Sequence, residues 1–170
     1  MIIQTTRLSL ISGDVDILQS AIDGDETLSI KLNVVVADGW TEFGPMPLRY
    51  SLDMLAKDPE EQKWLTYFTV LKDKQILIGF GGYKGKPADG IVELGYEIAP
   101  DYRGHGFATE YAQALIVHAF KEPNVQMVIA HTLAHENPST SILKKLGFAK
   151  IEEINDPEDG LIWRWELKKV

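Results

Sequence analysis

The sequence predicts an α/β (α+β) domain in which helices cover both faces of a central mixed, mostly antiparallel sheet of six to seven strands. In the middle of the chain, segments rich in apolar and β-branched residues follow one another at hairpin spacing. Later, strand patterns alternate with helical patterns, as in parallel strands joined by crossover helices. We see no linker or repeat, so we expect one domain spanning residues 1–170.

The N-terminal third combines one strand with helices. We expect a strand over 6–11 and helices over 14–23, 28–32 and 48–57. Asp14 suits the N-cap of the first helix and Gly24 its C-terminal end. The 28–32 segment also fits a strand, and we favour a short helix because Asp25 and Glu26 suit a helix start. Residues 39–47 predict a loop whose aromatic side chains either fill a hydrophobic gap or line a pocket.

The rest of the chain alternates strands with two helices. We expect strands over 64–71, 76–83, 91–98, 125–132, 148–154 and 161–167, a helix opening near Phe107, and a helix over 138–146. Apolar residues recur at helical spacing after Phe107 and make one buried face. Gly79, Gly81 and Gly82 in the second of these strands indicate a bulge or a close backbone approach, or only strand curvature, which we favour.

Composition excludes several functions. Apolar residues make up 45% and charged residues 25% of the chain, which is typical of a globular protein. No apolar run approaches the roughly 20 residues that span a bilayer, and no signal peptide is recognisable, so we expect a cytoplasmic protein without membrane association. The absence of cysteine excludes disulfides and thiolate chemistry. A net charge of −8 disfavours nucleic-acid binding and mildly favours a cationic substrate.

The stretch 95–110 indicates an anion site. It reads as a strand that ends at Pro100, a short turn, and a glycine-containing loop that opens directly into a helix. The run Arg103-Gly104-His105-Gly106 lies where the first backbone N–H groups of that helix lack partners. Two glycines let a ligand approach the backbone closely, and the helix N-terminus carries positive partial charge. We therefore expect this loop to bind a phosphate.

Three phosphate-loop patterns compete for this stretch. The dinucleotide fingerprint needs glycine or alanine where Thr109 stands, and an early βαβ unit that is missing here. The nucleoside-triphosphate loop needs Lys-Ser/Thr where Phe107-Ala108 follow the last glycine. The third pattern, Arg/Gln-x-x-Gly-x-Gly/Ala, is matched by Arg103, Gly106 and Ala108.

With Leu94–Ile98 before it and Phe107–Glu110 after it, this loop resembles the coenzyme A pyrophosphate loop of the GNAT family of N-acetyltransferases, in its RimJ/RimL branch. The order of elements is also similar to that family over nearly the whole chain. The resemblance implies a GNAT-type fold, in which the strands over 91–98 and 125–132 splay apart to form the coenzyme cleft. The coenzyme-binding residues that it implies are Ile98, Ala99, Arg103, Gly104, His105, Gly106, Phe107, Ala108 and Asn137.

The implied activity is transfer of an acetyl group from acetyl-CoA to a primary amine, by direct attack in a ternary complex. The acceptor is a peptide N-terminus or a small-molecule amine, and the protein is a monomer or a homodimer. The alternative is a non-catalytic acyl-CoA-binding sensor or interaction module. We expect no metal, because His131 and His135 run off a strand and lack the zinc-binding spacing.

Candidate catalytic residues follow from the same strand and helix. Glu93 and Glu97 share one face of the predicted strand, on either side of Gly95, whose missing side chain leaves room for a substrate. Either carboxylate could accept the proton of the amine, unless it pairs with Lys or Arg across the sheet. His131, on the adjacent strand, is a second candidate base.

For the acid that protonates the leaving thiolate, the family resemblance implies a serine on the second helix. Counting back from Gly147-Phe148 selects Ser139, although the spacing from Asn137 is one residue short of the family pattern. The alternative is that Ser139 only satisfies N–H groups of the first helical turn.

Overall fold

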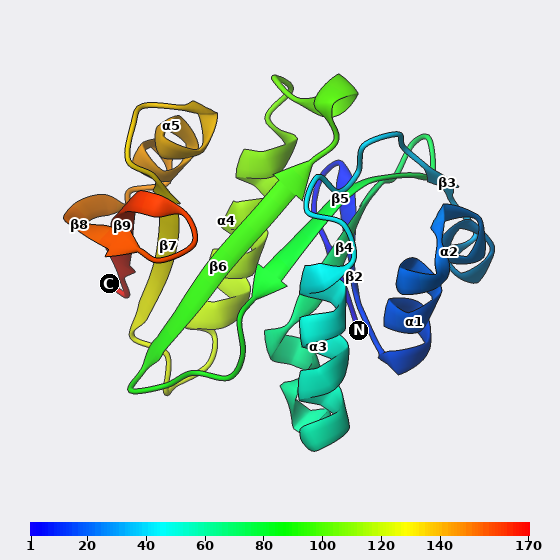
Figure 1. The fold of residues 1–170 in the computed structure, drawn as a ribbon, viewed down its shortest axis with the longest axis horizontal. Helices are drawn as coiled ribbons and strands as arrows, with labels where there is room; N and C mark the ends of the chain where they lie inside the picture. The colour runs from blue at the N-terminus through cyan, green and yellow to red at the C-terminus, as the bar shows by residue number, and fades with distance from the viewer.

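The computed structural model describes all 170 residues, which form one sheet with helices on both faces (Figure 1). The strands are β1 Ile2–Gln4, β2 Leu8–Ser12, β3 Val35–Val36, β4 Thr66–Leu71, β5 Ile76–Tyr83, β6 Ile91–Ile98, β7 Met127–Leu133, β8 Ala149–Asp156 and β9 Gly160–Lys168. The helices are α1 Val15–Asp23, α2 Asp25–Leu32, α3 Met46–Lys57, α4 Phe107–Phe120 and α5 Pro138–Lys145, with the 3-10 helices η1 Pro59–Trp64 and η2 Pro100–Tyr102. None of the helices is both long and apolar enough to cross a membrane.

The sheet is mixed and mostly antiparallel, as predicted. Its strands run in the order β1-β2-β4-β5-β6-β7-β9-β8, and β3 joins β5 at the side. Only the β6–β7 and β3–β5 pairs are parallel. All seven predicted strands are present, and the short β1 and β3 complete a sheet of nine. Because this single sheet takes in strands from both ends of the chain, we infer that residues 1–170 form one domain.

Two corrections concern β4 and β5. Trp64 ends the 3-10 helix η1, so the strand predicted from residue 64 begins at Thr66. The glycines of β5 mark a close backbone approach, and the β4–β5 register also shifts beside Gly79. A Cβ at Gly79 or Gly81 would collide with a β6 backbone carbonyl, and one at Gly82 with that of Leu65.

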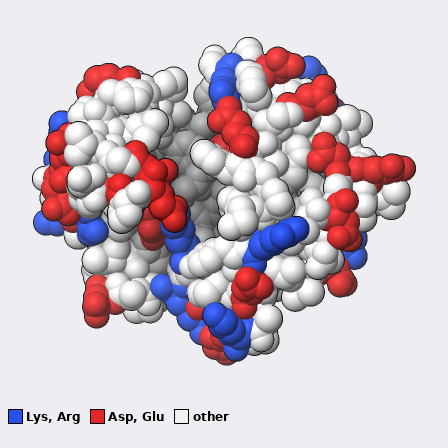
Figure 2. All heavy atoms as spheres, viewed as in Figure 1, with Lys and Arg blue, Asp and Glu red and all other residues white.

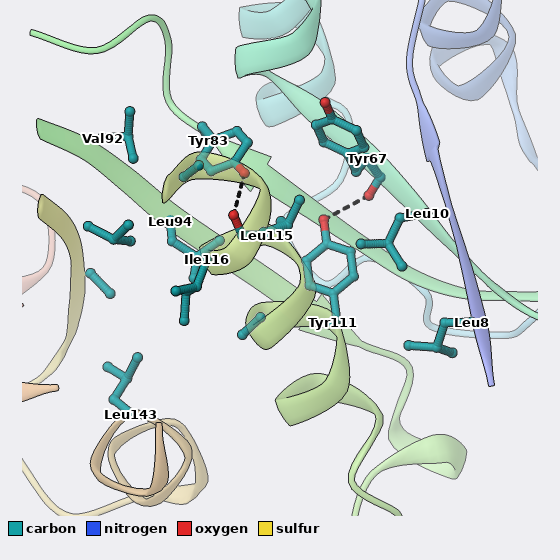
Figure 3. Close-up of a cluster of buried hydrophobic side chains, with 14 of the residues drawn as sticks. Leu8, Leu10, Tyr67, Tyr83, Val92, Leu94, Tyr111, Leu115, Ile116 and Leu143 are labelled. Carbon is teal, nitrogen blue, oxygen red and sulfur yellow. Dashed lines mark hydrogen bonds between the residues drawn. The ribbon is translucent and has the colours of Figure 1, made fainter. Parts of the chain in front are cut away.

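Separate hydrophobic cores lie on the two faces of the sheet. On one face, α4 and α5 pack through residues such as Leu115 and Leu143. Figure 3 shows how buried tyrosines join this core without orphaned hydroxyls: Tyr111 donates to the Tyr67 carbonyl at 2.9 Å and Tyr83 to the Leu115 carbonyl at 2.6 Å. On the other face, α1, α2 and α3 form the second core, with members that include Leu18, Leu28 and Leu48.

Strands β6 and β7 diverge after a short paired stretch. Their parallel register covers only Ile91 to Glu93 of β6, opposite Met127 to Ile129 of β7. Beyond Glu93, β6 continues to Ile98 paired only with β5. In Figure 1, α4 lies behind β6 and no helix lies in front of it. The splayed pair therefore leaves one face of β6 uncovered.

Candidate active site

The 103–108 loop leaves the N-terminus of α4 open. Gly104 and Gly106 have φ values of 78° and 82°, in the left-handed region that residues with a side chain rarely adopt. Gly106 is the N-cap of α4, and no side chain caps this helix. A Cβ at Gly104 would meet no atom within 4 Å. The first N–H groups of α4 therefore lack a side-chain partner and present the positive end of the helix dipole.

Arg103 ties this loop to the end of β6 and to the segment before α3. Its Nε donates to the Ile98 carbonyl at 2.8 Å, and its Nη2 pairs with the Glu42 carboxylate at 2.7 Å. Nothing in the sequence points to Glu42, which lies 61 positions from Arg103. The ion pair brings the 39–47 loop against the expected phosphate site.

Arg7 holds the loop from another side. Its Nη1 donates to the His105 carbonyl at 2.8 Å, its guanidinium lies 4.4 Å from the centre of the Phe107 ring, and its Nε pairs with Glu110 at 2.7 Å. Burial alone would raise the pKa of Glu110, but hydrogen bonds from Thr5 and Arg7 outweigh burial and lower it. Because the Phe107 side chain is buried, a ligand would meet the backbone of this residue.

At the end of β6, some backbone groups bond to β5 and others face the gap where β7 diverges. The Ala99 N–H donates to the Ile78 carbonyl of β5 at 2.7 Å. Residues of an antiparallel strand point their backbone groups alternately towards and away from the partner strand. The backbone groups of Ile98 therefore face the side of β7. Of the two residues expected to pair with an extended ligand, Ile98 faces the cleft and Ala99 is already bound to β5.

Glu93, Gly95 and Glu97 share the face of β6 opposite α4, as strand alternation requires. A Cβ at Gly95 would meet only Lys84 Cε, at 4.0 Å, so the space above this residue is bordered by the flexible Lys84 side chain. The Cα atoms of the two glutamates are about 13 Å apart along the strand. They are therefore too far apart to act on the same proton.

Glu97 lies against the 39–47 loop. The backbone N–H of Glu42 donates to Glu97 Oε1 at 2.6 Å. Burial raises the pKa of Glu97, while hydrogen bonds from the Glu42 backbone and Thr41 partly offset this effect. At neutral pH this carboxylate is closer to taking up a proton than an ordinary glutamate is, which fits a general base.

The two aromatic side chains of the 39–47 loop are placed differently. Trp40 is 3% exposed and packs on Phe68 and Phe80, so it fills the core beneath the loop. Phe43 is 68% exposed. Phe43 remains available to line a pocket.

Glu93 bridges β6 to β7. Its Oε1 accepts a hydrogen bond from Lys84 Nζ at 3.2 Å and lies 2.5 Å from His131 Nδ1. The pair with Lys84 confirms the alternative that one of the two glutamates meets a basic residue across the sheet. The Glu93 and His131 side chains are mostly buried, with 22% and 24% of their areas exposed.

On the α4 side of β6, Tyr96 meets Ser139 in the first turn of α5, with the hydroxyl oxygens 3.4 Å apart. Burial raises the pKa of Tyr96, and the hydrogen bond to Ser139 acts in the opposite direction. The phenol therefore stays protonated and can donate. Tyr96, which reaches this place from β6, was not among the candidate acids predicted from the sequence. Strand alternation, which puts Tyr96 on the face opposite Glu97, is the signal that could have found it.

Asn137 closes the N-terminus of α5. Its Oδ1 accepts from the Thr140 N–H at 3.0 Å and Thr140 Oγ1 accepts from the Asn137 N–H at 3.0 Å, which is a capping box. Its Nδ2 donates to the His135 carbonyl at 3.0 Å. Both side-chain amide atoms are engaged within the chain, and a contact between Asn137 and coenzyme stays a prediction.

The uncovered face of β6 forms the floor of a hollow. Figure 2 shows the surface hollowed between the part that carries β7 to β9 and the part that carries α3, with acidic side chains on both sides. We call this hollow the front groove, and its floor residues are Glu93, Gly95, Glu97 and His131. An open helix N-terminus beside a splayed strand pair, with carboxylates on the opposite face, suits a transferase with a phosphate-bearing donor and a cationic acceptor.

Comparison with known proteins identifies the family. The family profile described as "Acetyltransferase (GNAT) domain" matches residues 25–149. The chain belongs to the GNAT family and is an N-acetyltransferase.

Individual relatives agree with this assignment. The uncharacterized N-acetyltransferase YjdG of Bacillus subtilis (strain 168) is 28% identical over 153 residues, which cover 87% of this chain and 89% of YjdG. The Salmonella typhimurium acetyltransferase that modifies the N-terminal serine of 50S ribosomal subunit protein L7/L12 superposes with a TM-score of 0.73 at 13% identity, over 100% of both chains. RimL in complex with coenzyme A gives a TM-score of 0.72 at 13% identity, over 99% of this chain and 98% of RimL. At such identities the structural likeness concerns the fold, which is therefore of the GNAT type.

Proposed function

We propose that the protein uses acetyl-CoA to acetylate a primary amine in a ternary complex. The observation that carries this proposal is the uncapped N-terminus of α4 at the end of the splayed β6–β7 pair. The N–H groups there and the open surface of Gly104 suit the coenzyme pyrophosphate. The backbone of Ile98 suits the pantetheine arm, which would lie along β6 where β7 has left it.

The proposed coenzyme residues are Ile98, Ala99, Arg103, Gly104, His105, Gly106, Phe107 and Ala108. Most of them act through the backbone, because Phe107 is buried and the two glycines have no side chain. Arg103 would exchange its ion pair with Glu42 for a phosphate oxygen, since a guanidinium binds both groups in the same planar geometry. When bound, acetyl-CoA supplies a thioester whose carbonyl carbon is the electrophile.

The proposed acid is the Ser139 hydroxyl, with the Tyr96 phenol behind it as a second donor. These hydroxyls can return a proton to the departing thiolate from the α4 side of the cleft. On the front groove, Glu97 and Glu93 are the proposed carboxylates that attract the ammonium group of the acceptor and help to remove its proton. The space above Gly95, bordered by the Lys84 side chain, lies between them.

The acceptor is proposed to be a peptide N-terminus or a small primary amine. The carboxylates of the front groove and the net charge of −8 both favour a cationic substrate. The likeness to an enzyme that modifies an N-terminal serine makes serine- and alanine-initiated peptides the first acceptors to test.

A thiol-release assay tests this function. The purified protein is mixed with acetyl-CoA and a panel of serine-initiated peptides, alanine-initiated peptides and putrescine, and free coenzyme A is measured with a thiol reagent. We expect amine-dependent release with at least one acceptor, together with thermal stabilisation by coenzyme A. No release with any acceptor and no stabilisation by coenzyme A would contradict the proposal.

A further inference from the structure

His131 stands where the front groove opens between β6 and β7. The last paired residues of the two strands are Glu93 and Ile129. His131 lies two positions beyond Ile129, so its side chain is on the same face of β7. The His131 side chain contacts Glu93 across the gap, at the point where β6 and β7 begin to separate. An acceptor above Gly95 would therefore have the imidazole beside it.

The contacts of Glu93 select one tautomer of His131. Lys84 carries an ammonium group, which can only donate, and it donates to Glu93 Oε1. The same oxygen lies 2.5 Å from His131 Nδ1. With this oxygen acting as an acceptor, Nδ1 carries the hydrogen and Nε2 carries the lone pair. Nε2 takes part in none of the hydrogen bonds within the protein, so it is free to accept a proton.

Each of the two glutamates of the groove is already engaged through one carboxylate oxygen, Oε1. Glu93 Oε1 already holds both Lys84 and His131. Glu97 Oε1 holds the backbone N–H of Glu42. An imidazole nitrogen with a free lone pair, oriented by a carboxylate on its other nitrogen, is the arrangement that general bases use in acyl transfer.

We propose that His131 is the catalytic base of the acetyl transfer and that Glu93 is its positioning residue. This inference rests on the proposed N-acetyltransferase function. The proton of the acceptor would go to His131 Nε2 and not to the carboxylate of Glu93 or Glu97. Lys84 supports the arrangement by holding Glu93 in place.

His131 Nε2 removes one proton from the ammonium group of the acceptor and becomes an imidazolium. The neutral amine nitrogen forms a bond to the acyl carbon, and the carbon–sulfur bond breaks. The hydroxyls of Ser139 and Tyr96 give one proton to the leaving thiolate, and the second proton lost by the nitrogen passes through solvent to these hydroxyls and replaces it. The products are the amide and the coenzyme thiol, and the imidazolium returns its proton to solvent.

The charges around His131 come from four elements. Glu93 on β6 and Asp156 at the end of β8 are anionic, while Lys84 after β5 and Arg164 on β9, directly opposite His131, are cationic. The hydrogen bonds that Asp156 accepts from the Asp159 and Glu158 backbones lower its pKa, and the positive charge of Lys84 lowers it further. An imidazole must be neutral to act as a base, so the rate of acetyl transfer should rise with pH.

Single-turnover kinetics test this assignment, with enzyme in excess over acetyl-CoA and the best acceptor of the amine panel. For His131→Gln we expect the rate of acetyl transfer to fall about 10²- to 10⁴-fold, the usual contribution of a general base, and the rise of the rate with pH to disappear. For Glu93→Gln we expect a smaller fall and a displaced pH profile, because the imidazole remains but its orientation is lost. The affinity for coenzyme A should be unchanged in both variants.

Two control variants match these substitutions away from the groove. His118→Gln replaces a half-buried histidine near the C-terminal end of α4, and Glu152→Gln replaces an exposed glutamate on β8. Both should keep the wild-type rate and its pH profile. A His131→Gln variant with the wild-type rate would overturn the proposal, and so would a loss of activity in Glu97→Gln or Glu93→Gln that exceeds the loss in His131→Gln. Either result would leave acetyl transfer by the wild type intact, whereas failure of the proposed function would show as a wild type that acetylates nothing.

Discussion

The N-termini of α4 and α5 border the same splayed strands but satisfy their backbone in opposite ways. At α5, Asn137 and Thr140 exchange side-chain and backbone hydrogen bonds in a capping box. At α4, the N-cap is Gly106 and no side chain caps the helix. Every helix leaves its first N–H groups without intrahelical partners. At α5, side chains of the protein accept hydrogen bonds from these N–H groups. At α4, a ligand or water must accept them.

The two helix termini therefore serve different purposes: the α5 terminus stabilises the fold, and the α4 terminus is suited to bind a ligand. A capped terminus stabilises the fold whether or not a ligand is present. An uncapped terminus with left-handed glycines gives up that stability and gains an anion site. Substitutions at the α4 end should therefore change coenzyme affinity, while substitutions at the α5 cap should change stability.

The largest effect is expected from Gly106→Ala. A side chain at φ 82° strains the backbone, and the added Cβ would lie 3.3 Å from Arg7 Nη2. If the strained loop relaxes in the free protein, returning it to the bound shape costs about 1–3 kcal/mol. We expect coenzyme A affinity, measured by calorimetry, to fall about 5- to 150-fold, the equivalent of that energy.

Gly160→Ala is the matched control for Gly106→Ala. Gly160 has φ 73° at the start of β9, where the turn from β8 ends, and a Cβ there would meet nothing within 4 Å. The backbone strain is similar, but the turn is not part of the proposed coenzyme site. Equal losses of coenzyme affinity in the two variants would mean that the α4 terminus is not the binding site.

Arg7→Ala should lower both stability and coenzyme affinity. It removes the hydrogen bond to the His105 carbonyl, the pair with Glu110 and the contact with the Phe107 ring. Because Arg7 is partly exposed, we expect a loss of about 1–2 kcal/mol in the free energy of unfolding. Chemical denaturation measures this loss, and calorimetry should show weaker binding of coenzyme A. Unchanged binding would show that the loop keeps its shape without Arg7.

Asn137→Ala should lower stability by about 1 kcal/mol, the usual value of an N-cap, with little change in coenzyme affinity. Asn137→Ser keeps a capping oxygen and should restore most of the stability. Denaturation and calorimetry on both variants separate the two roles of Asn137. If Asn137→Ser is stable but binds coenzyme A weakly, Asn137 contacts the coenzyme as the family resemblance implies.

Glu97→Gln should produce the smallest effect, visible in the pH dependence of stability. Burial raises the pKa of Glu97 in the folded state, so the folded protein binds this proton more readily than the unfolded chain does. The stability of the wild type relative to Glu97→Gln should therefore fall as pH rises through the range in which glutamates titrate. Thermal unfolding of both proteins from pH 4 to pH 7 measures this difference in stability. A relative stability that rises with pH would contradict the pKa direction.

Much of the fold could be predicted because long segments carry clear periodicity. The strands over 76–83 and 91–98 and the helix after Phe107 each have enough residues to show a pattern. The strands β1 and β3, of three and two residues, are too short for a period and exist only because a neighbouring strand pairs with them. Trp64 lies in an apolar run but belongs to a 3-10 helix that propensity alone does not separate from a strand.

The part of the site that could be predicted consists of residues that are close together in the sequence. The 103–108 loop is a continuous motif, so its glycines and its position before a helix can be read directly. The contacts of Glu42 with Arg103, of Arg7 with His105 and of Glu93 with His131 span 61, 98 and 38 positions. Such pairs depend on how the sheet aligns distant segments, and no local pattern encodes them.

The most direct test compares coenzyme A with pantetheine, which lacks the diphosphate, in backbone amide NMR spectra of the protein. We predict that coenzyme A shifts the amide signals of Gly104 to Ala108 strongly and that pantetheine leaves them nearly unchanged. The amides of the capped α5 terminus, Ser139 to Ser141, should show no such difference between the two ligands. Equal responses of Gly104 to Ala108 to both compounds, or a diphosphate-dependent shift at α5 instead, would contradict the assignment of the uncapped α4 terminus as the coenzyme site.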